Sequence, residues 1–159
     1  MQTFLPSSNI TWSAMELDSK RLNKQILEAY QILNTLSTGA KAWSNHPAVL
    51  MWKGHEYSLR TYARTMAAEA KKRGIKVDKN LANLDILEHK YGHTWGTDMP
   101  KWFNQQSMSR IVATHRANLY RKDPIFYEAY ATAVNSEYNK PCCEKCLYYW
   151  PTHPLKKTK

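Results

Sequence analysis

Hydrophobic and polar positions alternate with the clearest helical period between Arg21 and Leu33. Apolar residues recur there at offsets of three and four, and charged or amide side chains gather on the other side. Such a polar side is typical of a solvated helix surface, but Glu28 is its single carboxylate and lies beside cations and an amide, which suits a group that stabilises a developing positive charge. The apolar stripe is Leu22, Ile26, Ala29 and Leu33, and the polar side is Arg21, Lys24, Gln25 and Glu28.

The predicted start and end of this helix come from capping signals. Ser13 and Glu16 have the S-x-x-E spacing of a capping box, so we expect the helix to begin there and to continue to about Leu36. Gly39 supplies a stop signal. Residues 1–12 contain proline and serines without periodicity and are predicted to be extended or looped.

Further helical patterns follow along the chain, and no segment alternates as a strand should. The sequence therefore predicts an all-α fold, a single compact domain of three to four principal helices with long connecting loops. We divide it into a helical domain, 1–135, and an extension, 136–159, with cysteines, aromatic residues and a basic tail. The later helices are expected from Pro47 to Trp52, from Gly54 to Gly74, over 81–89, from about Ser107, and around 126–130.

The charge balance points to a polyanionic partner. The 159 residues include 23 Lys and Arg against 13 Asp and Glu, a formal net charge of +10. This excess is spread over several segments, so nucleic acid is the favoured partner. The sequence has neither a secretory signal nor a stretch near the roughly 20 apolar residues of a membrane span. We expect a cytoplasmic monomer, either nucleoid-associated or phage-encoded, that does not bind membranes.

A cysteine cluster near the C-terminus is a candidate metal site. Cys143 and Cys146 have the C-x-x-C spacing of half a zinc site, and His153 lies nearby, but a second half with comparable spacing is missing. Reduced thiols beside the aromatic patch CLYYWP are the alternative. We therefore expect no cofactor, with zinc as the minority interpretation.

Four motifs in order carry a resemblance to a known family. They are RLNKQILEAYQIL, NHPAVLMWKGHEYSLRTYA, KKRG and THRANLYRKDPIFYEAY. Over roughly residues 1 to 130 the chain resembles the pyrimidine-dimer DNA glycosylases of the phage endonuclease V type and their bacterial relatives. The resemblance implies a small all-α protein that excises one base of a cyclobutane pyrimidine dimer in double-stranded DNA and then nicks the abasic site, without a metal.

The resemblance also implies two catalytic groups. The family's N-terminal α-amine attacks the sugar C1′ to form an imine, and a glutamate that matches Glu28 assists. An α-amine has a pKa near 8, so an appreciable fraction is unprotonated at neutral pH. The phage enzymes expose a threonine amine, whereas bulky Gln2 is expected to keep Met1 in place. Aligning Leu5 with the family's early leucine puts the Met1 amine at the position of the nucleophile.

The expected DNA contacts follow from the same resemblance. Cations beside the catalytic glutamate and on a later helix are expected to hold phosphates, which fix register but not base sequence. His46 either faces the site or is structural, and Tyr127, like Tyr130, either stacks on bases or packs on the first helix. Trp52 and Tyr57 are expected in the core. The predicted DNA-binding set is Gln2, Arg21, Lys24, Gln25, His46, His115, Arg116, Lys122 and Tyr127.

Two other functions stay open at this point. One is a glycosylase for a different modified base, because lesion choice depends on pocket shape. The other is a basic helical DNA-binding module without catalysis. A metal-dependent nuclease is disfavoured because no acidic cluster with suitable spacing is found.

Overall fold

Helices form the regular structure of residues 1–140 and 147–152, the part of the chain that this computed structural model describes. The predicted all-α fold is confirmed, and four helices of 14 to 20 residues are its principal elements. Within the described ranges, none of the helices is long and apolar enough to cross a membrane. The elements are α1 (Ile10–Glu16), α2 (Ser19–Thr38), α3 (Pro47–Leu50), α4 (Glu56–Lys72), α5 (Asp78–Tyr91), η1 (Gly92–Thr94), α6 (Gln105–Lys122) and η2 (Glu128–Asn135).

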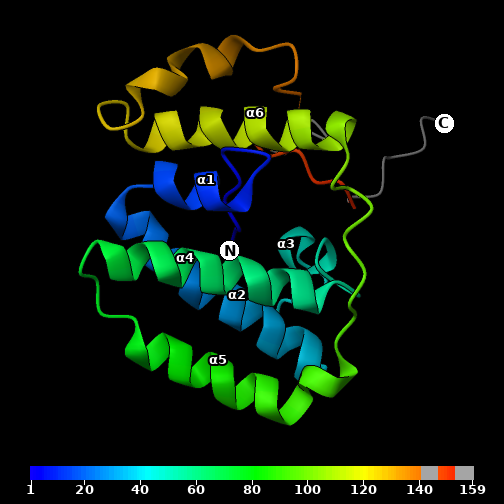
Figure 1. Cartoon of the computed structure of the whole chain (residues 1–159). Coiled ribbons are helices and arrows are strands. Elements are labelled where there is room, and N and C mark those ends of the chain that lie inside the picture. The colour runs from blue at the N-terminus through cyan, green and yellow to red at the C-terminus, as the bar shows by residue number, and fades with distance from the viewer. Residues whose placement is uncertain (141–146, 153–159) are drawn as a thin grey trace, which may run out of the picture.

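The helices stack around a central pair, α2 and α4, which share the most extensive contact. Helix α5 covers α2 at one end of the molecule, and η2 covers α6 at the opposite end (Figure 1). Helix α1 lies between α4 and α6, and the N-terminus ends in the middle of the stack rather than at its edge (Figure 1). This arrangement places the first residues of the chain among several helices.

Helix α2 buries the stripe predicted from its periodicity. Leu22, Ile26, Ala29 and Leu33 are at most 1% exposed, so this face forms the core with α4. Gly39 ends the helix with a left-handed φ of 67°, as expected.

The predicted start of α2 at Ser13 is wrong. The backbone becomes extended at Leu17, which ends α1. Helix α2 begins at Ser19, where the Asp18 side chain accepts from the Arg21 backbone N–H. Ser13 lies inside the separate helix α1, where its hydroxyl donates to the Ser7 carbonyl. Both Ser13 and Asp18 are good cap residues, and the tertiary contact of Ser13 decides between them.

Other predicted elements agree with small changes. Helix α3 starts at Pro47 but stops at Leu50, before Trp52. Helices α4 and α5 occupy the expected regions, and the last segment is a 3₁₀ helix rather than an α-helix. Trp52 is fully buried as predicted, whereas Tyr57 is 40% exposed, so its expected place in the core is wrong.

The described part of the predicted extension packs against the helical stack. The Leu147 carbonyl accepts from the Asn118 side chain, and the Tyr149 N–H donates to the Thr114 hydroxyl, both on α6. Trp150 belongs to the buried core. The division of the chain at residue 135 stays a prediction, and Cys143, Cys146 and His153 lie outside the described residues.

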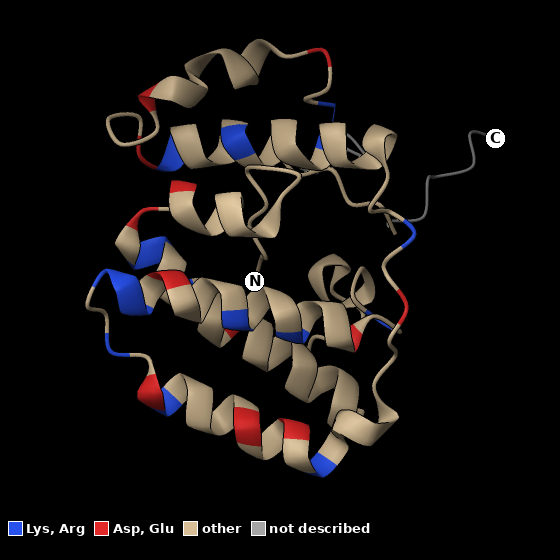
Figure 2. Ribbon diagram, in the orientation of Figure 1, with Lys and Arg blue, Asp and Glu red and all other residues tan. Residues whose placement is uncertain are grey.

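Charges are distributed unevenly over the helices. Helix α6 has cations but no carboxylate, whereas α5 has several carboxylates (Figure 2). Arg60 and Arg64 of α4 pair with Glu88 of α5 at 2.9 and 2.7 Å, so part of the charge of α4 and α5 is neutralised. The cations of α6 are Arg110, Arg116, Arg121 and Lys122.

Candidate active site

An extended N-terminal segment, residues 1–7, forms the centre of the candidate site. Residues 2–7 are all buried although the segment has no regular structure. Buried backbone N–H and C=O groups need partners, and a segment without a helix or sheet must find them among side chains. The contacts of this segment therefore show which parts of the fold hold it.

Side chains of α2 and α6 accept from the backbone of this segment. The Gln2 N–H lies 3.0 Å from Glu28 Oε2, and the Phe4 N–H lies 2.7 Å from Gln25 Oε1. The Leu5 N–H donates to His115 Nδ1 at 2.8 Å. Helices α2 and α6 thus hold the segment from two sides.

Side chains from later parts of the chain also donate to the same segment. Tyr62 donates to the Phe4 carbonyl at 2.8 Å, and Trp52 Nε1 donates to the Thr3 hydroxyl at 3.0 Å. Arg116 Nε donates to the Pro6 carbonyl at 2.6 Å. These contacts fix the position of the chain's first residues relative to α2.

Glu28 is 7% exposed, so its carboxylate needs compensation. Beside the Gln2 N–H, the Lys24 ammonium lies 3.5 Å from Oε1, and Gln25 Nε2 lies 3.4 Å from Oε2. A cation and two N–H donors therefore surround the carboxylate, as expected from the sequence. Gln25 and Glu28 are nevertheless buried by the N-terminal segment, so this side of α2 is not a solvated surface.

The Met1 α-amine lies next to this carboxylate. Three covalent bonds link the Met1 and Gln2 nitrogens, so these atoms are within roughly 4 Å of each other. With the hydrogen bond from Gln2, the α-amine is at most about 7 Å from the Glu28 carboxylate. Met1 as a whole is partly exposed, and it packs against the edge of the hydrophobic core.

His46 completes the polar part of the site. Its Nδ1 accepts from the Ala48 N–H at 3.1 Å, so it caps α3. Burial lowers the pKa of His46, the positive N-terminus lowers it further, and Glu28 opposes both. The neutral imidazole, the α-amine and Glu28 therefore act on one another within one cluster.

Aromatic rings close the site on its other side. The Trp150 ring lies 5.9 Å from His46, and the Tyr148 ring lies 5.5 Å from His115. Burial raises the pKa of Tyr148 to about 12, and the charge of Glu28 contributes in the same direction. Sequence reasoning missed Tyr148 and Trp150 because the patch CLYYWP was considered only as a neighbour of the cysteines.

The matching family model is described as pyrimidine dimer DNA glycosylase and covers residues 1–83, just over half of the chain. The chain belongs to this family. It is thus a DNA glycosylase of the pyrimidine-dimer type and binds DNA. The match includes the N-terminal segment, α2 and α4, whereas the THRANLYRKDPIFYEAY motif lies beyond it. No curated protein and no solved structure matches the chain.

Several predicted DNA contacts of the glycosylase are partly or fully exposed. Lys24 and Lys122 are exposed, and Arg21 is partly exposed and pairs with Asp18 at 3.1 Å. Arg21 and Arg121 are both close enough to Tyr148 to lower its pKa, against the larger effects of burial and Glu28. Arg121, which is exposed and is not among the predicted contacts, thus lies near Tyr148.

His115, Gln2 and Gln25 are corrected as direct DNA contacts, because they are 1%, 5% and 1% exposed. Burial lowers the pKa of His115 to about 3, so the ring is neutral and its Nδ1 accepts from Leu5. These three side chains position the N-terminal segment, and none is open to a phosphate. Spacing along a helix does not distinguish a side chain that holds the N-terminal segment from one that binds a phosphate.

Arg116 and Tyr127 are also placed differently from the prediction. The Arg116 guanidinium is bound to the Pro6 carbonyl and lies 5.0 Å from the Tyr130 ring centroid. Tyr127 is 2% exposed, donates to the Asp18 carboxylate and accepts from the Asp18 N–H. Of the two alternatives for Tyr127, the structure supports packing, at the start of α2, over its predicted place in the DNA-binding set.

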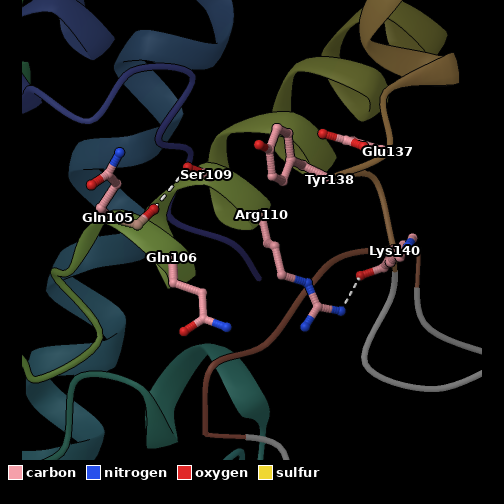
Figure 3. A pocket seen from close by; sticks show the side chains of 7 residues that line it. All are labelled: Gln105, Gln106, Ser109, Arg110, Glu137, Tyr138 and Lys140. Carbon is pink, nitrogen blue, oxygen red and sulfur yellow. Dashed lines mark hydrogen bonds between the residues drawn. The ribbon is translucent and has the colours of Figure 1, made fainter.

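A separate cavity of about 650 Å³ lies between the start of α6 and residues 137–140 (Figure 3). Arg110 lies over the Tyr149 ring at 4.1 Å, donates to the Lys140 carbonyl and is directed toward this cavity (Figure 3). Among the described lining residues, neither Met1 nor Glu28 occurs. The cavity is therefore distinct from the site around the N-terminus.

Proposed function

We propose that this glycosylase excises one base of a pyrimidine dimer from double-stranded DNA through an imine on the Met1 α-amine, and then cleaves the abasic site as a lyase. The hydrogen bond from the Gln2 N–H to Glu28 carries the proposal, because it holds the α-amine beside a buried carboxylate. An amine nucleophile and an adjacent acid–base group are what this reaction needs.

In the first step, the lone pair of the α-amine attacks the sugar C1′. The bond from C1′ to the pyrimidine nitrogen breaks, and its electron pair leaves with the base, which takes up a proton. The amine loses a proton. The C1′–O4′ bond then opens with its electron pair on O4′, which takes up a proton to become a hydroxyl, and an iminium forms between C1′ and the amine nitrogen. Glu28 stabilises the positive charge that develops on the sugar and accepts the proton from the amine.

In the second step, a general base of the enzyme removes a proton from C2′. The electron pair forms a C1′–C2′ enamine double bond and then eliminates the 3′ phosphate. Water hydrolyses the remaining imine and restores the free amine. The hydrogen bond from the Gln2 N–H to its carboxylate supports Glu28 as the group that carries these protons.

The surrounding charges support binding of a duplex by one copy of the chain. Lys24 lies beside Glu28, Arg21 and Arg121 lie near Tyr148, and Lys122 follows Arg121 at the end of α6. Such cations neutralise phosphates without reading base sequence, which suits an enzyme that recognises a distorted duplex. All proposed catalytic groups come from a single chain, so a monomer is sufficient.

The test is borohydride trapping on three duplexes that differ only in containing a thymine dimer, an abasic site or no lesion. We expect a covalent adduct with the first two duplexes, with or without chelator, and none with the undamaged one. An adduct with the abasic site alone would indicate that the enzyme excises another modified base and not the thymine dimer. Tight binding without any adduct would contradict the imine mechanism.

A further inference from the structure

Trp43 has an unusual backbone conformation. Of the described residues, it is the single non-glycine residue with a positive φ, 65°. Bulky L-residues rarely adopt this left-handed region, where glycine or asparagine is more readily accommodated. Trp43 lies in the turn between α2 and α3, and its carbonyl accepts from the His46 N–H at 2.9 Å.

The side chain of Trp43 is also unusual, because it is 61% exposed. A large indole in water contributes little to the hydrophobic core, so the fold gains little from tryptophan at this position. Strained backbone that persists without a packing reason points to a functional constraint. A constraint of this kind suggests a ligand for the exposed ring.

The position of the ring indicates what that ligand is. The Trp43 ring centroid lies 5.7 Å from that of His46, whose pKa responds to both the α-amine and Glu28. Trp150 also packs edge-on against His46 at 5.9 Å and is 8% exposed. Trp43 is therefore the exposed member of a group of rings around His46, the residue that senses the charge of the proposed nucleophile.

The chemistry near this ring fits a nucleobase. Lys41, which is exposed, lies in the same turn as Trp43, and Lys24 lies beside Glu28. Cations that hold a DNA backbone next to an exposed aromatic ring form the usual surface on which an unpaired base stacks. A base beside the target sugar would thus come within reach of the indole when that sugar approaches Met1.

We infer that Trp43 stacks on a nucleobase that has left the helical stack next to the sugar attacked by the enzyme, and so determines how readily the lesion is opened. The inference rests on the proposed function for the position of that sugar. Stacking itself needs no chemistry, so it can be measured separately. Trp43 is thus a specificity-determining residue rather than an acid, base or nucleophile.

The test compares Trp43→Asn and Trp43→Phe with the same two substitutions at Trp12, which is also 61% exposed but lies in α1. Asparagine tolerates the left-handed backbone, so Trp43→Asn is expected to melt no lower than the wild type. We expect it to slow single-turnover excision at a thymine dimer about tenfold or more, while Trp43→Phe stays within about threefold of the wild type. Adduct formation on a preformed abasic site should change less than excision does.

A second readout is the fluorescence of 2-aminopurine placed opposite an abasic site. The wild type should quench it by stacking, Trp43→Asn should leave it bright, and both Trp12 variants should behave as the wild type. Equal excision rates and equal quenching for Trp43→Asn and Trp12→Asn would overturn the inference. Absence of any adduct with the wild type would contradict the imine mechanism instead, and the quenching would still decide the role of Trp43.

Discussion

The Gln2 backbone N–H and Glu28 Oε2, 3.0 Å apart, join the beginning of the chain to the middle of its longest helix. This bond keeps the α-amine of Met1 within about 7 Å of a carboxylate that is almost fully buried. A hydrogen bond to a charged group is worth about 1.5–3 kcal/mol in proteins, enough to keep an otherwise irregular segment in one position. The chain end thereby becomes part of a preorganised site.

Replacing the carboxylate should separate binding from chemistry. Glu28→Gln keeps an oxygen that accepts from Gln2, so the fold and DNA affinity should stay within a few-fold of the wild type. Excision and strand cleavage should fall by about 10²–10³ or more, because the charge that we propose to stabilise the transition state is lost. Single-turnover kinetics and equilibrium binding on the dimer duplex measure the two effects. Asp85→Asn, at an exposed carboxylate on α5, is the control.

Two cations of α6 should behave differently in salt. Lys122→Ala should reduce the slope of log affinity against log salt by about 1, because an exposed phosphate contact is lost. Arg116→Ala should leave that slope unchanged and lower the free energy of unfolding by about 1–3 kcal/mol, because the Pro6 carbonyl loses its donor. Equal slopes for both variants would contradict this division.

Acid should weaken the fold through His115. Burial lowers its pKa to about 3 in the folded protein, while the unfolded value is about 6.5. The unfolded chain then binds more protons as pH falls below about 6.5, so stability is complete above that pH and is lost as pH decreases toward 3. We expect the free energy of unfolding to fall by up to about 1.4 kcal/mol per pH unit in this window.

Urea unfolding between pH 7.5 and 4.5 tests this dependence against His115→Gln. The variant removes the titrating ring and should be less stable at neutral pH but flatter with pH. A slope unchanged by the substitution would assign the acid sensitivity to other groups, such as His46, whose pKa is also lowered.

Tyr127 should affect stability without affecting catalysis. Hydrogen bonds from Tyr127 and Arg21 hold the pKa of Asp18 below its usual value despite the opposing effect of burial. Tyr127→Phe removes one of them and should lower the free energy of unfolding by about 1–3 kcal/mol. The excision rate should match that of Tyr138→Phe, a substitution at an exposed ring. A loss of rate larger than the loss of folded protein would restore Tyr127 as a DNA contact.

The sequence predicts the helices well because their signals are local. The apolar period of α2 and α4, the stop at Gly39 and the proline start of α3 all depend on neighbouring residues. The break between α1 and α2 was not predicted, because Ser13 and Asp18 are both suitable caps. The choice depends on the contact of Ser13 with Ser7, which lies outside the helix.

The site is only partly predictable for the same reason. Glu28 stands out as a single carboxylate among cations, and the resemblance associates it with the chain end. Residues 1–7 have no period, and several partners of their backbone are side chains 21 to 110 positions away. That distance is why His115 was interpreted as a phosphate contact, although it supports Leu5.

The measurement that tests the central claim most directly is the position of the trapped adduct. Lys24 offers a second amine, 3.5 Å from Glu28, so trapping alone does not distinguish it from Met1. We predict that, after borohydride reduction with an abasic-site duplex, mass spectrometry of the digested protein finds the added sugar on the N-terminal peptide. Lys24→Arg should still form this adduct. A sugar on Lys24, or loss of the adduct in Lys24→Arg with DNA binding intact, would contradict the α-amine as nucleophile.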